Sequence, residues 1–151
     1  YRRREYTEAA DVYDQFYQLY GETSDQAAYA LLQAARATYA SFGGVRYDIT
    51  PLLEAEQRYE RFARLYPLRA SEANVSGILR QIRDIRAQRL YMTARLYQRT
   101  SKPKAAAHYY RRLNERYGQS DWARRGRTAL RKLAEAGKIP AAGTGNREAE
   151  S

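Results

Sequence analysis

The side chains that could catalyse a reaction are few and scattered in this chain. His108 is the only histidine and there is no cysteine, so a zinc site would lack the further nitrogen or sulfur ligands that it requires. Two close pairs of carboxylates, Asp11 with Asp14 and Glu54 with Glu56, have the residue type that general acid and base chemistry uses. Both pairs fall near the first turns of predicted helices or on their wet faces, and no other reactive side chain accompanies them.

A phosphate-binding loop is also missing from the sequence. The glycine pair Gly43-Gly44 is not followed by the Lys and the Ser or Thr that a P-loop requires. We therefore predict that the protein is not an enzyme and that it holds no cofactor and no metal. The tyrosines and the basic residues are the two sets of side chains that could instead provide a binding function.

The tyrosines make up 15 of the 19 aromatic residues, and their rings could stack on nucleic-acid bases or on peptides. The rings recur, however, at intervals of four and three residues, which places them along one face of a helix. This regularity favours packing between helices over stacking on a ligand.

Lysine and arginine outnumber aspartate and glutamate by 27 to 17, which gives a net charge of +10. Many of them lie in two predicted helices: Arg80, Arg83, Arg86, Arg89 and Arg95 in one, and Arg124, Arg125, Arg127, Arg131 and Lys132 in the other. They are spread over every helix face, which favours a solvated surface. The alternative is attraction to acidic protein surfaces, anionic lipid head groups or nucleic acid, with an affinity that falls steeply with salt. The sequence contains no recognisable nucleic-acid-binding motif.

Apolar residues recur at helical spacing along nearly the whole chain, so we predict an all-α fold. Six helices are expected, near residues 3–20, 24–42, 50–66, 70–99, 103–117 and 120–136. Glycine or proline marks most of their ends, as at Gly21, Pro67 and Gly118. Residues 1–137 are predicted to form a helical repeat domain, and residues 138–151 a flexible C-terminal tail. No stretch approaches the roughly 18 apolar residues of a membrane helix.

One pattern of small and aromatic residues, which we call the aromatic ladder, occurs three times. Its copies are Ala9, Tyr13, Phe16, Tyr20 and Gly21; Ala55, Tyr59, Phe62, Tyr66 and Pro67; and Ala106, Tyr110, Leu113, Tyr117 and Gly118. The small residue comes first, where a neighbouring backbone can approach closely, and the last residue ends the helix. The copies start 46 and then 51 residues apart, a period that is typical of a helical solenoid.

The ladder resembles the second helix of a tetratricopeptide repeat. The stretches "AEQRYERFARLYP", "RAQRLYMTARLYQRTSKPKAAAHYYRRLNERYG" and "QSDWARRGRTALRKL" together resemble the BamD-like family of outer-membrane assembly lipoproteins, over about residues 50–136. Tyr91, Ala94 and Tyr97 match the Tyr-x-x-Ala-x-x-Tyr element that precedes a short turn and an Ala-rich helix in that family. The resemblance implies a tetratricopeptide-like right-handed superhelix of about six antiparallel helices.

The resemblance also implies a non-catalytic protein-protein interaction scaffold for the assembly of outer-membrane β-barrel proteins, at the periplasmic face of a bacterial outer membrane. Its partners would be assembly-machinery components or extended peptides, and nucleic acid is not expected. The membrane would be reached only through a lipid anchor on a cysteine upstream of the first residue. The alternative is a soluble basic helical-repeat module, located in the cytoplasm, that binds acidic peptides or nucleic acid.

A binding surface can be placed from the expected superhelix, in which the first helix of each pair tends to line the concave side. The predicted helices at 24–42, 70–99 and 120–136 would then supply that surface. We expect a partner to meet their polar positions, namely Gln33, Arg36, Arg80, Asp84, Arg124 and Arg127.

Overall fold

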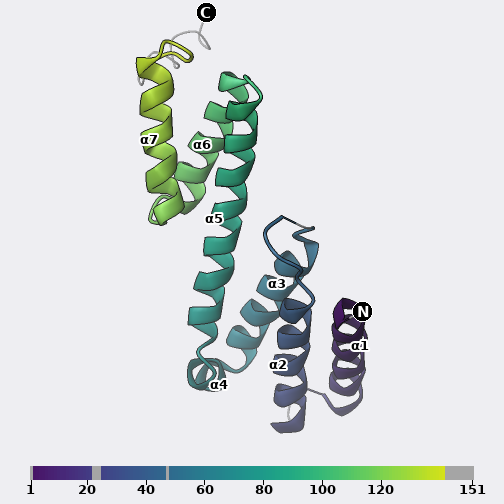
Figure 1. The fold of residues 1–151 in the computed structure, drawn as a ribbon. Helices are drawn as coiled ribbons and strands as arrows, with labels where there is room; N and C mark the ends of the chain where they lie inside the picture. Colours follow the sequence, from purple (N-terminus) through teal and green to yellow (C-terminus); the bar gives the residue numbers. More distant parts are fainter. Residues whose placement is uncertain (1, 22–24, 47, 142–151) are drawn as a thin grey trace, which may run out of the picture. The chain divides into compact units, whose positions relative to one another are not determined.

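The computed structural model describes residues 2–21, 25–46 and 48–141, and in these ranges every regular element is an α-helix (Figure 1). The helices are α1 (Arg2–Tyr20), α2 (Asp25–Ala40), α3 (Thr50–Leu65), α4 (Pro67–Glu72), α5 (Val75–Arg99), α6 (Pro103–Tyr117) and α7 (Asp121–Glu135). Helices that follow one another pack in antiparallel pairs, which confirms the predicted fold class. The chain divides into two compact units, which we call unit 1 (residues 1–82) and unit 2 (residues 83–151).

The structure corrects the predicted fourth helix. In place of one helix over residues 70–99, the short helix α4 is followed by α5, so the described residues form seven helices and not six. Between them Asn74 takes a left-handed backbone conformation with a φ of 53°. Asparagine tolerates this conformation better than most residues. Pro67, predicted only to end the preceding helix, also begins α4 because its fixed φ suits a first helical turn.

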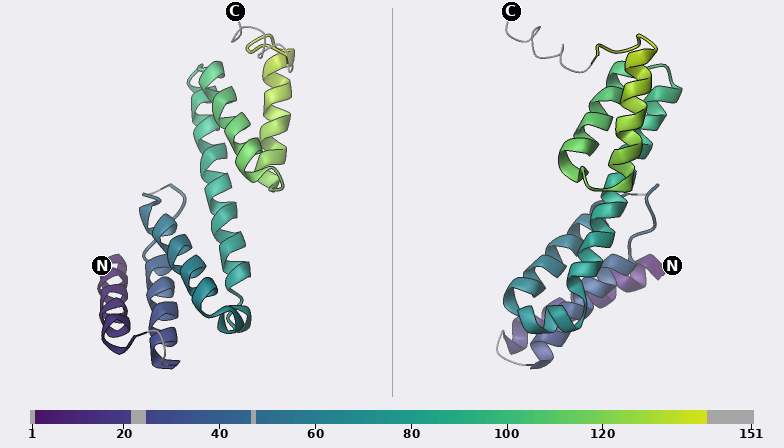
Figure 2. Two further views of the ribbon diagram at one scale, coloured as in Figure 1. Left: turned by 180° about the vertical axis from the view of Figure 1, so that it is seen from behind. Right: turned by 90° about the vertical axis from the view of Figure 1, so that its left-hand side faces the viewer.

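Unit 1 is built around the alanine-rich helix α2, which packs against both α1 and α3 (Figure 2). Its buried residues are almost all small: Ala27, Ala28, Ala30, Leu31, Ala34, Ala35, Ala37 and Thr38. Small side chains let neighbouring backbones approach closely, and a helix with two neighbours needs them around much of its circumference. The composition of α2 is therefore that of a helix in the middle of a stack.

The aromatic ladder is buried in its second and third copies, as predicted. Their first three residues, namely Ala55, Tyr59, Phe62, Ala106, Tyr110 and Leu113, are each at most 1 % exposed. The first copy departs from the prediction, because α1 buries Ala10 and Tyr17 while Phe16 is half-buried and Tyr20 is 58 % exposed. Among the described helices only the backbone of α2 lies close to that of α1, and α3 reaches α1 through the long side chains of Arg58 and Arg61. A narrower stripe of α1 is therefore covered, displaced from the ladder positions.

Unit 2 consists of the C-terminal part of α5, then α6 and α7, with α6 next to both of the others (Figures 1 and 2). Its core residues are Ala87, Ala94, Ala106, Ala107, Tyr110, Leu113, Ala123, Leu133 and Ile139. The start of α7 is capped by Ser120, whose Oγ accepts a hydrogen bond of 3.1 Å from the backbone N–H of Ala123. This cap satisfies one of the N–H groups that a helix start leaves without a helical partner.

The end of α7 is closed by a turn that returns the chain to the core. Gly137 has a positive φ of 70°, its N–H donates to the carbonyl of Ala134, and the N–H of Lys138 donates to the carbonyl of Leu133. This is the Schellman arrangement that commonly ends helices. Ile139 is then 8 % exposed in the core, so the boundary predicted at residue 137 falls short of the last core contact. The rest of the predicted tail, residues 142–151, lies outside the described residues.

The crossing of α6 and α7 depends on the missing side chain of Gly126. A Cβ atom at this position would lie 3.2 Å from Cδ2 of Leu113 and 3.3 Å from Cδ1 of Tyr110. Gly126→Val is therefore expected to lower the free energy of unfolding by about 1–3 kcal/mol through overpacking. Urea denaturation measures this cost, with Arg131→Val at an exposed position of the same helix as the control. Valine is a better helix former than glycine, so helix propensity alone would stabilise Gly126→Val. An unchanged or raised midpoint for this variant would therefore contradict the crowding.

Candidate functional site

Among the side chains that could catalyse a reaction, Asp14 has a structural role, Asp11 and Glu54 are exposed, and Glu56 is half-buried. Nη1 and Nη2 of Arg58 donate hydrogen bonds of 2.6 and 2.7 Å to the two carboxylate oxygens of Asp14, which ties α3 to α1. The hydrogen bond to Asp14 is the main cause that raises the pKa of Arg58 above its ordinary value. His108 is exposed and its ring lies 5.3 Å from that of Tyr109. Within the described ranges, no group of histidines and carboxylates could hold a metal ion.

Three of the residues predicted to bind a partner lie in unit 1. Gln33 and Arg36 are one helical turn apart on α2, where Gln33 is half-buried and Arg36 is exposed. Burial raises the pKa of Tyr59, and the nearby charge of Arg36 lowers it by a smaller amount. The guanidinium of Arg36 therefore lies near the contact between α2 and α3. Arg80 is exposed on the part of α5 that belongs to unit 1.

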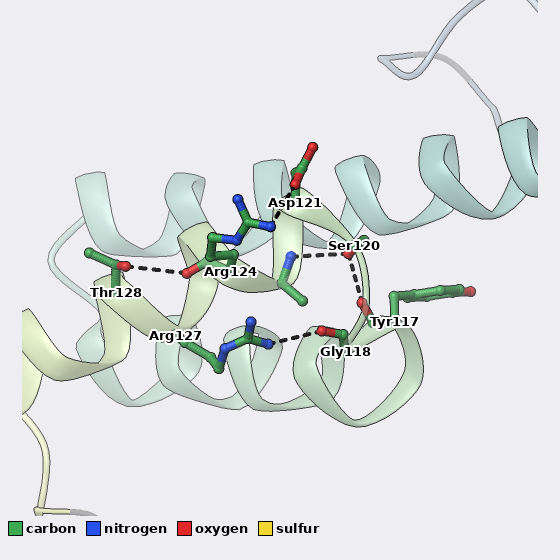
Figure 3. Close-up of polar contacts among 8 residues, drawn as sticks. Tyr117, Gly118, Ser120, Asp121, Arg124, Arg127 and Thr128 are labelled. Carbon is green, nitrogen blue, oxygen red and sulfur yellow. Dashed lines mark hydrogen bonds and ion pairs between the residues drawn. The ribbon is translucent and has the colours of Figure 1, made fainter.

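The other three predicted residues lie in unit 2, and two of them are shown in Figure 3. The exposed side chains of Arg124 and Asp121 form an ion pair of 3.2 Å on the first turns of α7. Arg127 has a different role, because its Nη1 donates to Oδ1 of Asn114 at 2.8 Å and to the carbonyl of Gly118 at 3.0 Å. Arg127 therefore stabilises the turn between α6 and α7. Asp84 is exposed on α5.

The six predicted residues thus fall into three pairs, each on one helix. The pairs are Gln33 with Arg36, Arg80 with Asp84, and Arg124 with Arg127. No hydrogen bond or ion pair between described side chains joins one pair to another. Their role in binding a partner stays a prediction.

Sequence analysis did not identify a groove in unit 2 with a volume of about 600 Å³, which we call the basic groove. It is lined by Tyr91, Arg95, Gln98 and Arg99 of α5, Tyr110 of α6, Arg125, Thr128, Ala129 and Lys132 of α7, and Lys138. The spacing of the basic residues in the sequence could have indicated this groove. Arg95 and Arg99 are four residues apart, and Arg125 and Lys132 are seven apart, so each pair shares one face of its helix.

Comparison with known proteins adds the family of the chain. A search of curated proteins gives no match. A family described as outer membrane lipoprotein, YfiO, matches residues 1–140, and none of the described helices is long and apolar enough to span a membrane. This family is non-catalytic, which confirms the prediction that the protein is not an enzyme. The chain therefore belongs to the YfiO family of outer membrane lipoproteins, the BamD family that its sequence resembles.

Proposed function

We propose that the chain is a scaffold that binds other proteins during the assembly of β-barrel proteins, at the periplasmic face of a bacterial outer membrane. The observation that carries this proposal is the family match over residues 1–140, because membership implies a role in outer-membrane protein assembly. The use of the aromatic residues supports it. The buried tyrosines of the second and third ladder copies pack between helices, so the polar helix faces remain available to partners.

The proposed partners are assembly-machinery components or extended peptides, and the proposed contact residues are Gln33, Arg36, Arg80, Asp84, Arg124 and Arg127. Most of these side chains are exposed. Arg127 is a poor choice for a test, because its substitution would also remove two hydrogen bonds of the α6–α7 turn. Arg36, Arg80 and Arg124 test the surface without this complication.

A photo-crosslinking amino acid in place of Arg36, Arg80 or Arg124 is expected to give adducts with other envelope proteins in living cells, identified by mass spectrometry. The matched controls are Arg64 on α3 and Arg111 on α6, two exposed arginines on the second helices of their pairs. We expect several-fold fewer adducts from these positions. Equal yields from both sets would contradict the proposed surface. Adducts with nucleic acid in place of proteins would favour the alternative, a soluble basic module.

A further inference from the structure

The basic groove of unit 2 lies between two polar helix faces. One face is formed by Arg95, Gln98 and Arg99 of α5, and the other by Arg125 and Lys132 of α7, with Lys138 added by the turn after α7. The lining thus brings together five cationic side chains and includes no carboxylate. Hydrogen-bonding groups of Gln98, Thr128 and two tyrosines complete it. This composition suits an anionic ligand.

Positive charge dominates the basic groove and the unit that contains it. None of the five forms an ion pair with a carboxylate in the part of the chain that the structure describes. Unit 2 holds 17 of the 27 Lys and Arg residues and 6 of the 17 Asp and Glu residues, a net charge of +11, whereas unit 1 has a net charge of −1. An anion in the groove would therefore relieve the mutual repulsion of its cations.

A row of aromatic rings holds part of the groove in place. The guanidinium of Arg125 lies 4.7 Å from the ring centroid of Trp122, which lies 5.5 Å from the ring of Tyr91. The ring of Tyr91 is in turn 5.9 Å from that of Tyr110, whose hydroxyl donates a hydrogen bond of 2.7 Å to Oε1 of Gln98. Because these contacts restrain Arg125 and Gln98 before a ligand arrives, less conformational entropy is lost on binding.

We propose that the basic groove binds a phosphate group, carried by an anionic lipid head group or by a free phosphate. Arginine guanidinium groups match phosphate oxygens with paired hydrogen bonds, and three of the five cations are arginines. Nucleic acid is a weaker candidate, because sequence-tolerant binding of single strands uses aromatic rings as stacking platforms. Tyr110 is only 1 % exposed, and the half-buried ring of Tyr91 already contacts the rings of Tyr110 and Trp122, so neither ring offers such a platform.

The test compares two triple variants of the full chain. The groove variant carries Arg95→Gln, Arg125→Gln and Lys132→Gln. The control variant carries Arg83→Gln, Lys104→Gln and Arg111→Gln, at exposed positions of unit 2 outside the groove. Both changes lower the formal net charge from +10 to +7, so diffuse attraction affects them alike. Circular dichroism and thermal melting establish that both fold, and the single variant Lys132→Gln replaces the groove triple if it does not.

Two probes distinguish the sources of the phosphate. Inorganic phosphate is added while nuclear magnetic resonance follows the indole N–H of Trp122 and the side-chain amide of Gln98. Vesicles of phosphatidylglycerol and phosphatidylcholine are compared with vesicles of phosphatidylcholine alone. We expect the affinity for the anionic vesicles to fall roughly 100-fold in the groove triple, about fivefold in Lys132→Gln alone, and less than about tenfold in the control triple.

The outcomes separate as follows. Groove-dependent vesicle binding that inorganic phosphate inhibits supports a lipid head group. Phosphate-induced shifts at Trp122 and Gln98, with no difference between the triples on vesicles, support a free phosphate. Equal losses in both triples together with an absence of phosphate-induced shifts would overturn the proposal. Tighter, groove-dependent binding of a single-stranded oligonucleotide than of the vesicles would also overturn it, in favour of nucleic acid.

Discussion

Replacing Phe62 with alanine is expected to lower the free energy of unfolding by about 3–5 kcal/mol. Phe62 lies in the second copy of the aromatic ladder, is 1 % exposed, and its ring centroid is 5.6 Å from that of Tyr66. Truncation removes the ring from a close-packed interior and leaves a cavity that the neighbouring helices can fill only in part. Urea denaturation followed by far-ultraviolet circular dichroism measures the loss as a lower midpoint with an unchanged slope.

The first copy of the ladder provides the matched control. Phe16 has the same place in the repeat, but it is half-buried, and its ring lies 4.4 Å from that of Tyr20 near the end of α1. Phe16→Ala is expected to cost about 1 kcal/mol, since less of its apolar area leaves water on folding. Equal losses from the two substitutions would contradict the difference in burial. An unchanged midpoint for Phe62→Ala would contradict the packing role of the ladder.

Most helix boundaries could be predicted because the residues that end helices act locally. The expected helix at 103–117 coincides with α6, and the expected helix at 50–66 differs from α3 by one residue. Proline at the first turn restricts the backbone, and glycine after the last turn permits conformations that end a helix, whatever the neighbouring helices do. The break at Asn74 escaped prediction because asparagine only tolerates a left-handed conformation and does not require it.

Burial was harder to predict, because it depends on which helices surround a residue. The three ladder copies have the same spacing, but only the copies in α3 and α6 bury their first three residues. In α1 the buried residues are displaced by one position, to Ala10 and Tyr17. The burial of Ile139 near the C-terminus could not be predicted either, because a single apolar residue after Gly137 has no periodicity that would indicate its place in the core.

The candidate sites depend on contacts between helices, which the spacing of residues along one helix does not show. Arg124 and Arg127 are both polar positions of the helix predicted to line the concave side, but Arg127 is bound to the α6–α7 turn. The basic groove needs side chains from α5 and α7 to face each other across α6. A sequence shows which residues share a helix face, but only the packing of three helices shows which faces meet.

The two most buried tyrosines should make the fold sensitive to alkali. Tyr59 in α3 and Tyr110 in α6 are each 1 % exposed, and burial raises the pKa of each from 10 to about 12. Nearby arginines act in the opposite direction by favouring the phenolate, namely Arg36 for Tyr59 and Arg95 for Tyr110, but their effect is smaller. The buried hydroxyls therefore keep their protons at pH values where an unfolded chain releases them.

The sign of the effect on stability follows from this difference. Above pH 10 the unfolded chain loses the tyrosine proton and gains stability, whereas the folded chain holds it until about pH 12. Each tyrosine thus contributes fully to the free energy of unfolding below pH 10. This contribution, about 2–3 kcal/mol per tyrosine, is lost as the pH rises to about 12. Urea midpoints across this window measure the loss.

Trp122, the only tryptophan, allows the part due to Tyr110 to be followed by fluorescence, since both residues lie in unit 2. Tyr110→Phe keeps the ring and removes the titrating group, so its unfolding midpoint should fall less between pH 10 and 12 than that of the unmodified chain. Because the variant also loses the hydrogen bond to Gln98, it should be less stable at neutral pH, and the two stability curves should approach each other as the pH rises. Parallel curves would mean that the proton on Tyr110 does not contribute to the alkaline loss of stability.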